Sequence, residues 1–362
     1  MRKNKIIAYL LVICMFMCMM ISCSKTENAM EYKGETISFN LYSYWMSQIK
    51  SSFVSSENDT NEYWDTEYSD GSTYEERLRQ IVNFNVKVNL ICKKMFKDMG
   101  LEISESDLKE IEEALSDMLN SYGSKSELNT FLSKYNINYD MLYEIYKAEL
   151  RTSMVFDALY SEGGERYLSE EKIDEYFKNT YHHIDIIMIS DSVEVETDSE
   201  GNIVYDETSG SPKTRELTEQ ESQAKKQLAD DIITRLDRGE DFDDLKSQYN
   251  EDPNKSVFTN GYYISSNNVS TYGSEMVLAA QNMQTGEYKK LEFDGVICIL
   301  MCKELEEKAY NDDNYADQLS DMITYCKQDD FNSYMKEFAD EVVVNEDVIS
   351  KISVKEAALM GS

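Results

Sequence analysis

Hydrophobic residues recur at helical spacing through most of residues 41–178 of this chain. In the segment 73–99, for example, apolar side chains return every three or four positions and Gly100 follows as a stop signal. Two of the later segments open on Ser104 and Ser169, a residue type that caps helix N-termini. Residues 55–72 are polar and rich in turn formers, and we expect a loop there. The expected helices cover residues 41–54, 73–99, a segment opening at Ser104, 126–135, 139–161 and 169–177.

The pattern changes at Tyr181, where β-branched and alternating positions replace the helical spacing. Residues 182–190 read as a strand, and 295–303 read as the strand that closes the same sheet. Between them the sequence predicts helices at 218–238, 243–249 and 274–281, a short strand at 261–265 and a turn at 286–288. The acidic stretch 191–217 reads as a surface insertion, with a hairpin turn at Gly201-Asn202.

After residue 304 the helical spacing returns at 315–341, followed by a short strand at 342–344 and a fraying tail. A small hairpin is expected at 31–39. We therefore expect an α+β fold, in which a helical domain (31–178) is completed by 305–350 and interrupted by a β-α-β domain (179–304). Met and Tyr are abundant on the helical faces, which suits core packing and also suits an adaptable surface for varied apolar segments.

The first 23 residues have the order of an export signal. Arg2, Lys3 and Lys5 precede an apolar run of about 16 residues, and Ser22-Cys23 follows it. This order is similar to a bacterial lipobox, so we expect a signal peptide at 1–22, lipidation of Cys23 and a polar tether at 23–30. An uncleaved membrane helix is the alternative, although the run is shorter than the ~20 residues that span a bilayer. Either way, the body of the protein is expected outside the cytoplasm.

Charge and composition exclude several classes of function. The chain carries 69 acidic and 36 basic residues, a net charge of −33 that repels polyanions, so no nucleic-acid partner is expected. Its only histidines, His182 and His183, are adjacent, and no CxxC lies near them. No metal site and no cofactor is therefore expected. On one strand, Cys298 and Cys302 would lie about 13 Å apart, too far for a disulfide.

Three local motifs resemble one known family. The first is the helix–turn–short helix of Ala224 to Tyr249, leading into Glu251-Asp252-Pro253. The second is Ala279-Ala280-x-x-Met283-x-x-Gly286-Glu287-Tyr288, and the third is Phe338-Ala339-Asp340-x-Val342-x-Val344-Asn345. In this order they resemble extracytoplasmic foldases of the PrsA/SurA type, in which a SurA-like helical chaperone domain is interrupted by a parvulin-type peptidyl-prolyl isomerase domain.

The resemblance implies a site and also indicates what that site has lost. Family members carry two histidines over an apolar slot, and here Ile186 and Ile297 fall at those two positions. Tyr272 and Met276 fall on the slot, and Asp252 falls on the third polar position. We expect the two isoleucines to meet at the floor of the pocket. No catalytic residue is assigned with confidence, and His182 and His183 are expected at the surface where the strand begins.

These expectations favour a membrane-anchored foldase or holdase that binds unfolded exported polypeptides, with weak or absent isomerase activity. An active peptidyl-prolyl isomerase is one alternative, because an apolar slot alone favours a twisted amide. A non-catalytic scaffold lipoprotein with a single partner is the other.

Overall fold

The computed structural model describes residues 27–196, 198, 200, 204–206, 209–293 and 295–360. The predicted signal peptide, Cys23 and the Gly201-Asn202 turn lie outside these residues. The chain forms two compact units, which we describe separately. The helical unit comprises Met1–Tyr167 and Asp330–Ser362, and the inserted unit comprises Leu168–Asp329. Helices and strands are mixed along the chain, so the predicted α+β fold class is confirmed.

The helical unit is built on helices that begin where the sequence supplies capping side chains. Thr73 and Glu76 form a reciprocal capping box, which satisfies two backbone amides at the start of one helix. Ser104 caps the next helix and satisfies one more amide there. The helices are α2 (Phe39–Phe53), α3 (Asn61–Asp65), α4 (Tyr74–Asp98), α5 (Glu105–Tyr122), α6 (Lys125–Leu132), the 3-10 turn η1 (Ser133–Tyr135), α7 (Tyr139–Tyr160), the end of α14 (Met322–Ala339) and α15 (Glu346–Ile349).

A three-stranded antiparallel sheet joins the two ends of this unit, in the order β2 (Glu35–Ser38), β1 (Asn28–Tyr32), β9 (Val343–Val344). Ala29 and Met30 are buried in it, so this part of the expected tether is strand instead of linker. The expected fraying after residue 344 is also wrong, because Ile352 and Val354 are buried and hold the tail in place.

Two further expectations about helices are corrected by the structure. The loop expected at 55–72 contains α3, because Trp64 is fully buried and anchors a short helix in an otherwise polar stretch. The single helix expected at 315–341 is divided by a turn at Ser320 and Asp321. Its parts are η4 (Asp313–Tyr315), α13 (Ala316–Leu319) and α14.

The inserted unit has a four-stranded antiparallel sheet in the order β6 (Tyr262–Ile264), β3 (His182–Ser190), β8 (Val296–Lys303), β7 (Tyr288–Phe293). Strand β7 is not among the strands that the sequence predicts, because two lysines interrupt its apolar alternation. The expected turn at 286–288 leads into it. Its other elements are α8 (Glu170–Thr180), β4 (Val193–Val195), β5 (Thr214–Glu216), α9 (Glu219–Asp237), α10 (Phe242–Tyr249), η2 (Ser266–Asn268), α11 (Val269–Tyr272), α12 (Ser274–Asn282), η3 (Ala309–Asn311), η4, α13 and the start of α14.

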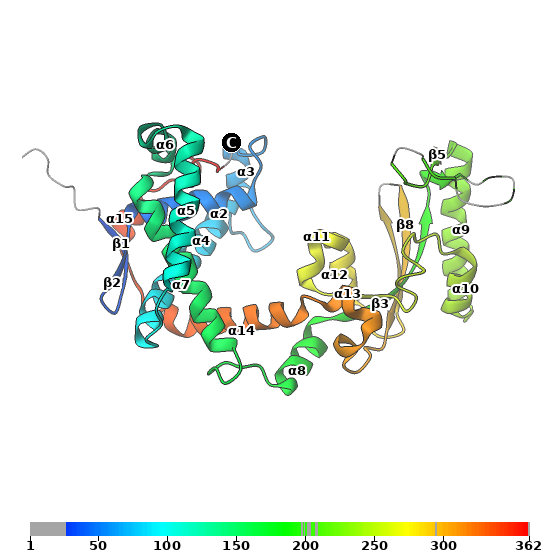
Figure 1. The fold of residues 1–362 in the computed structure, drawn as a ribbon. Helices are drawn as coiled ribbons and strands as arrows, with labels where there is room; N and C mark the ends of the chain where they lie inside the picture. Colours follow the sequence, from blue (N-terminus) through cyan, green and yellow to red (C-terminus); the bar gives the residue numbers. More distant parts are fainter. Residues whose placement is uncertain are drawn as a thin grey trace, which may run out of the picture. The chain divides into compact units, whose positions relative to one another are not determined.

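Helices cover both faces of this sheet, with α11 and α12 on one side and α9 and α10 on the other (Figure 1). Successive side chains of a strand point to opposite faces, so each strand feeds two separate cores. The core on the α12 side contains Ile184, Ile186, Met276, Cys298 and Leu300, among others. The core on the α9 side contains Ile187, Ile189, Ile232, Ile297 and Ile299, among others.

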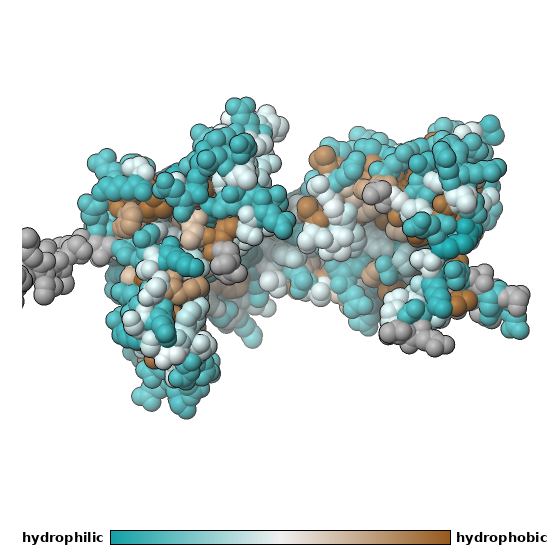
Figure 2. All heavy atoms as spheres, turned by 90° about the horizontal axis from the view of Figure 1, so that it is seen from above, coloured by the Kyte–Doolittle hydropathy of each residue, from teal (hydrophilic) through white to brown (hydrophobic). Residues whose placement is uncertain are grey.

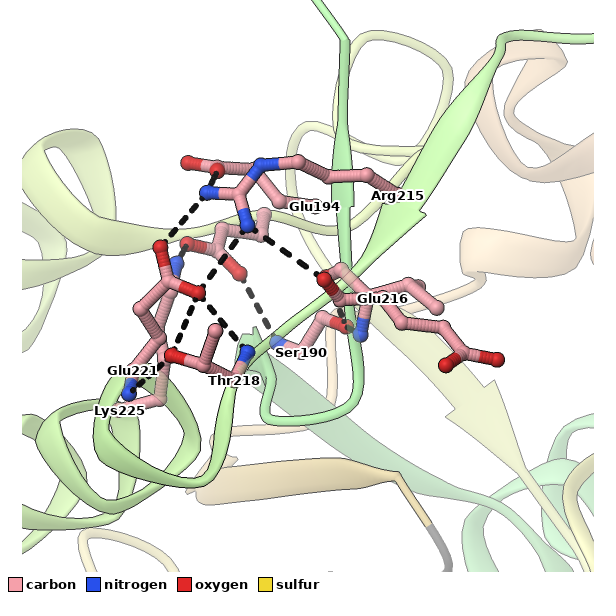
Figure 3. Close-up of polar contacts among 9 residues, drawn as sticks. Ser190, Glu194, Arg215, Glu216, Thr218, Glu221 and Lys225 are labelled. Atoms are coloured by element: carbon pink, nitrogen blue, oxygen red, sulfur yellow. Dashed lines mark hydrogen bonds and ion pairs between the residues drawn. The ribbon is translucent and has the colours of Figure 1, made fainter.

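An arginine joins the described ribbon of the 191–217 insertion to the N-terminus of α9 (Figure 3). Arg215 donates from both terminal nitrogens to Glu221, at 3.1 and 2.8 Å, and also pairs with Glu194. Glu221 in turn completes a capping box with Thr218. The ribbon of β4 and β5 and the start of the helix are thereby held by the same carboxylate.

Candidate functional site

The predicted slot lies on the α12 face of the sheet. Ile186 and Met276 are buried in the same cluster, and Tyr272 packs against it. The ring of Tyr272 meets that of Tyr262 edge-on, with centroids 5.8 Å apart. The structure therefore brings together three of the residues that the sequence singled out, from strand β3, helix α11 and helix α12.

Asp252 joins this group through a neighbouring tyrosine. It is buried, and its Oδ2 accepts a hydrogen bond of 2.6 Å from the hydroxyl of Tyr262. Its Oδ1 accepts from the backbone amide of Asn254 at 2.8 Å, which is the contact of a turn-forming residue. Burial and then the bond to Asp252 raise the pKa of Tyr262. Asp252 is therefore a committed acceptor and not a free base.

Ile297 does not reach this slot, so the expectation that it meets Ile186 is wrong. In the β3–β8 register Ile186 pairs with Leu300, while Ile297 pairs with Ile189 and lies in the core on the α9 side. Because side chains alternate along a strand, a shift of one residue exchanges the two faces. Ile297 and Ile299 alternate with Cys298 and Leu300 along β8, and this alternation indicates that the strand contributes to two cores. The sequence does not indicate which of the two pairs faces α12 and which faces α9.

Cys298 occupies the place at the slot that was expected for Ile297. It pairs with Met188 across the strands and is a diagonal neighbour of Ile186, roughly 7–8 Å away by sheet geometry. Burial, and secondarily the charge of Asp252, raise the pKa of its thiol to about 12. The thiol is therefore protonated and unreactive at neutral pH.

No imidazole lines the slot. The chain has only two histidines, and neither belongs to the slot cluster. A catalyst of prolyl isomerisation has to stabilise a twisted amide by polar contacts, because the amide barrier is ~18–20 kcal/mol. Hydrocarbon and a buried thiol now stand at the floor of the slot, and its one acidic group already accepts from Tyr262 and Asn254.

His183 is buried instead of exposed, which corrects the expectation of a surface residue. Its Nδ1 lies 3.0 Å from the carbonyl oxygen of Glu304, and its Nε2 lies 2.7 Å from that of Asn260. Its ring stacks on Tyr263 with centroids 4.7 Å apart. The residue therefore ties strand β3 to two neighbouring segments, a structural role that a surface assignment had missed.

A polar pocket of about 460 Å³ opens beside His183. Two of its lysines, Lys246 and Lys303, reach the buried carboxylate of Asp185 at 2.6 and 2.9 Å. Lys246 also donates to the carbonyl of Thr259 at 2.8 Å. These cations are thus engaged in fastening α10 and β8 to β3.

A groove of about 320 Å³ lies on the helical unit between α2, α4 and α7. Its apolar lining consists of Trp45, Ile49 and Val88, and its polar lining consists of Gln48, Asn85, Asn89, Glu149 and Thr152. Desolvation raises the pKa of the Glu149 carboxyl, and a hydrogen bond with Gln48 offsets part of that effect. Figure 2 shows hydrophobic atoms reaching the surface of this unit among hydrophilic ones. The groove combines apolar contact with side-chain amides that both donate and accept.

Within the part of the chain that the structure describes, no three potential ligands gather into a metal site. Among those same residues, no helix has the length and apolar character that crossing a bilayer requires.

One family model matches part of the chain. Residues 42–134 match the family described as the bacterial trigger factor protein C-terminus. This range runs from α2 to η1, and therefore includes the α2 and α4 walls of the groove. No curated protein matches the chain.

Several solved foldases are similar to the chain at low identity. PrsA from Bacillus subtilis is 18% identical, with 79% of this chain and 90% of that chain covered and a TM-score of 0.25. Foldase protein PrsA from Streptococcus pneumoniae is 16% identical, with 90% and 98% covered and a TM-score of 0.25. A structure described as SurA-like chaperones of Campylobacter jejuni is 11% identical, with 75% and 88% covered and a TM-score of 0.24. The chain thus resembles PrsA- and SurA-type foldases.

Proposed function

We propose that this protein is a membrane-anchored extracytoplasmic chaperone that binds unfolded exported polypeptides. The observation that carries the proposal is the groove between α2, α4 and α7. Residues 179–304 form, in this proposal, a parvulin-like domain with weak or absent isomerase activity. Cys23, lipidated after removal of residues 1–22, is the proposed anchor.

The lining of the groove suits an unfolded chain of almost any sequence. Trp45, Ile49 and Val88 offer apolar contact to a client side chain. Gln48, Asn85 and Asn89 each donate a hydrogen bond within the unit, and each amide keeps a carbonyl oxygen and a second N–H that can bond to a peptide. Because every residue of an unfolded chain except proline exposes both a backbone N–H and a C=O, this recognition requires no particular sequence.

The overall charge favours the same role. With a net charge of −33, copies of the protein repel one another. This repulsion keeps molecules with apolar binding surfaces from associating at the membrane face. An acidic surface also draws basic segments of clients toward the groove, and this attraction weakens with salt.

The slot of the inserted unit supports binding rather than catalysis. The floor of the slot carries Ile186 and Cys298 and no imidazole that could hydrogen-bond to a prolyl amide. The carboxylate of Asp252 already accepts a hydrogen bond from Tyr262. Tyr272, which is only partly buried, still offers apolar contact to a client segment. In the proposal, this unit therefore adds surface to the chaperone.

The test is suppression of aggregation of an unrelated exported protein by residues 23–362 at equimolar amounts. Ile49→Glu places a charge in the groove and should abolish most of the suppression. The matched control is Leu278→Glu on α12, which adds the same charge at a side chain that is 60% exposed. If the two variants suppress aggregation equally, the groove is not the client site. If the unaltered protein suppresses none, the chaperone proposal fails.

A further inference from the structure

The last described residues of the chain are held by side chains of the helical unit that bond to their backbone. We call Ala357–Met360 the tail peptide. Nζ of Lys50 on α2 donates to the carbonyl oxygens of Lys355 and Ala357, at 3.3 and 2.8 Å. The amide of Met360 donates to Oγ of Ser51 at 2.7 Å. Side chains of α2 therefore form hydrogen bonds with backbone groups of the tail.

Tyr135 of η1 adds a further contact of this kind. Its hydroxyl donates to the carbonyl of Leu359 at 3.4 Å, at the long end of the range for such a bond. The side chains of Ala358 and Met360 pack against an apolar cluster of the helical unit, whose buried members include Leu132, Tyr135 and Leu142. Backbone hydrogen bonds and apolar side-chain contacts thus act on the same four residues.

Lys50 is the centre of this site and is fully buried. Its ammonium lies 2.8 Å from Oδ2 of Asp59 and 5.5 Å from the ring centroid of Trp64. An ammonium has three hydrogens, and Asp59 and the carbonyls of Lys355 and Ala357 supply three acceptors. A buried ammonium that loses the Ala357 acceptor is left with an unsatisfied hydrogen, which is costly, so the site requires a peptide carbonyl or water in that place.

Burial divides this end of the chain into an anchor and a looser part. Ile352 and Val354 are 5% and 0% exposed, so they belong to the core. All four residues of the tail peptide are only partly buried. Segments with few buried contacts open locally at a free energy well below that of global unfolding. The tail peptide can therefore leave while the anchor stays in place.

We propose that the surface around Lys50, Ser51 and Tyr135 is a second polypeptide-binding site, which takes short apolar segments. Its present occupant, the tail peptide, is an intramolecular competitor that clients displace. The inference rests on the proposed function for the identity of the client, although the site itself is argued from the contacts of the tail peptide alone.

This arrangement limits exposure of an apolar surface when no client is present. The apparent affinity for a client equals the affinity of the open site multiplied by the fraction of molecules in which the site is open. Closure by the tail peptide therefore weakens client binding. A client carbonyl then replaces that of Ala357 at Lys50, and client side chains replace Ala358 and Met360. The site is distinct from the groove, whose lining comes from Trp45, Gln48 and Ile49 of α2.

The first test measures binding of a fluorescent synthetic peptide with the sequence of residues 353–360. It is titrated into the protein of residues 23–362 and into a version that ends at Glu356, which keeps Ile352 and Val354. The shortened protein should bind the peptide at least about tenfold more tightly, because its site is always open. Equal affinity for the two proteins contradicts the proposal. Circular dichroism confirms that both are folded.

A second variant keeps every residue of the tail. Ser51→Cys combined with Met360→Cys allows a disulfide that closes the site, since Oγ of Ser51 lies 2.7 Å from the amide of Met360. Oxidation should remove peptide binding, and reduction should restore it. Ser51→Cys alone is the control and should bind the same under both conditions. Undiminished binding to the crosslinked protein overturns the proposal.

The outcomes separate this inference from the proposed function. If the protein suppresses client aggregation while shortening and crosslinking leave peptide binding unchanged, the second site is wrong and the chaperone role stands. If the peptide binds as expected while no client is protected, the site stands and the chaperone role is wrong.

Discussion

The hydroxyl of Tyr262 donates a 2.6 Å hydrogen bond to the buried carboxylate of Asp252. This hydrogen bond occupies the acidic group at the slot. Asp252 is the residue that the family resemblance places at the third polar position of the site. On the sheet beneath it lie Ile186 and Cys298, and neither offers an imidazole. The slot is therefore a packed apolar surface, bordered by an acidic side chain whose two oxygens already accept hydrogen bonds from Tyr262 and Asn254.

Removing this donor should destabilise the inserted unit. Tyr262→Phe leaves the carboxylate of Asp252 buried without its tyrosine partner, and we expect a loss of about 1–3 kcal/mol in the free energy of unfolding. Urea denaturation of the whole protein measures it. Tyr272→Phe is the matched control, since Tyr272 contributes its ring to the same cluster without holding Asp252. Equal losses from the two variants would show that the hydrogen bond contributes nothing.

The face assignment of β8 predicts where isomerase chemistry could be restored. We expect the protein to leave the isomerisation rate of a proline peptide at its uncatalysed value. Ile186→His combined with Cys298→His places two imidazoles on the slot face and should give a measurable rate.

The control for that design changes the other isoleucine. Ile186→His with Ile297→His puts the second imidazole in the core on the α9 side, where it should only lower stability. If the control variant gains isomerase activity, the assignment of Cys298 to the slot is wrong. The same conclusion follows if neither double variant gains activity. Substantial activity in the unaltered protein contradicts the proposal of a degenerate site.

Glu221 should report on the attachment of the insertion. The bond from Arg215, followed by those within the capping box, lowers the pKa of Glu221 to about 2. A depressed carboxyl pKa stabilises the fold above its unfolded value of about 4.3, and that contribution is lost as the pH falls from there to about 2. Arg215→Gln should raise the pKa of Glu221, which carboxyl chemical shifts in an NMR titration measure. Lys226→Gln is the control and should leave it unchanged.

Lys50 should be among the most sensitive charged residues of the helical unit. Lys50→Met leaves Asp59 without its ion pair in a largely buried place, and we expect a loss of about 3–5 kcal/mol. Lys109→Met is the matched control, because the exposed pair of Lys109 with Glu113 contributes at most about 1 kcal/mol. Thermal unfolding of the two variants measures the difference. Similar midpoints would mean that Lys50 is not the structural centre described here.

Local chemistry in the sequence determined most of the helices. Thr73, Ser104 and Thr218 each mark a helix start within one residue, because a capping side chain acts on its own neighbours. The strands β3 and β8 were also predictable, since both are rich in β-branched and other apolar residues. Strand β7 was not, because its stability comes from pairing with β8 and not from its own composition.

The sequence by itself determined that the chain has helical segments, a sheet of apolar strands and only two histidines, because each of these depends on local pattern or on simple counting. Only the tertiary structure decided that Cys298 and not Ile297 faces Met276, since strand pairing chooses the face and a shift of one residue reverses it. The burial of His183 and the capture of the tail peptide by Lys50 likewise depend on partners from 77 to 307 positions away. Contacts at such separations leave no periodic trace along the chain.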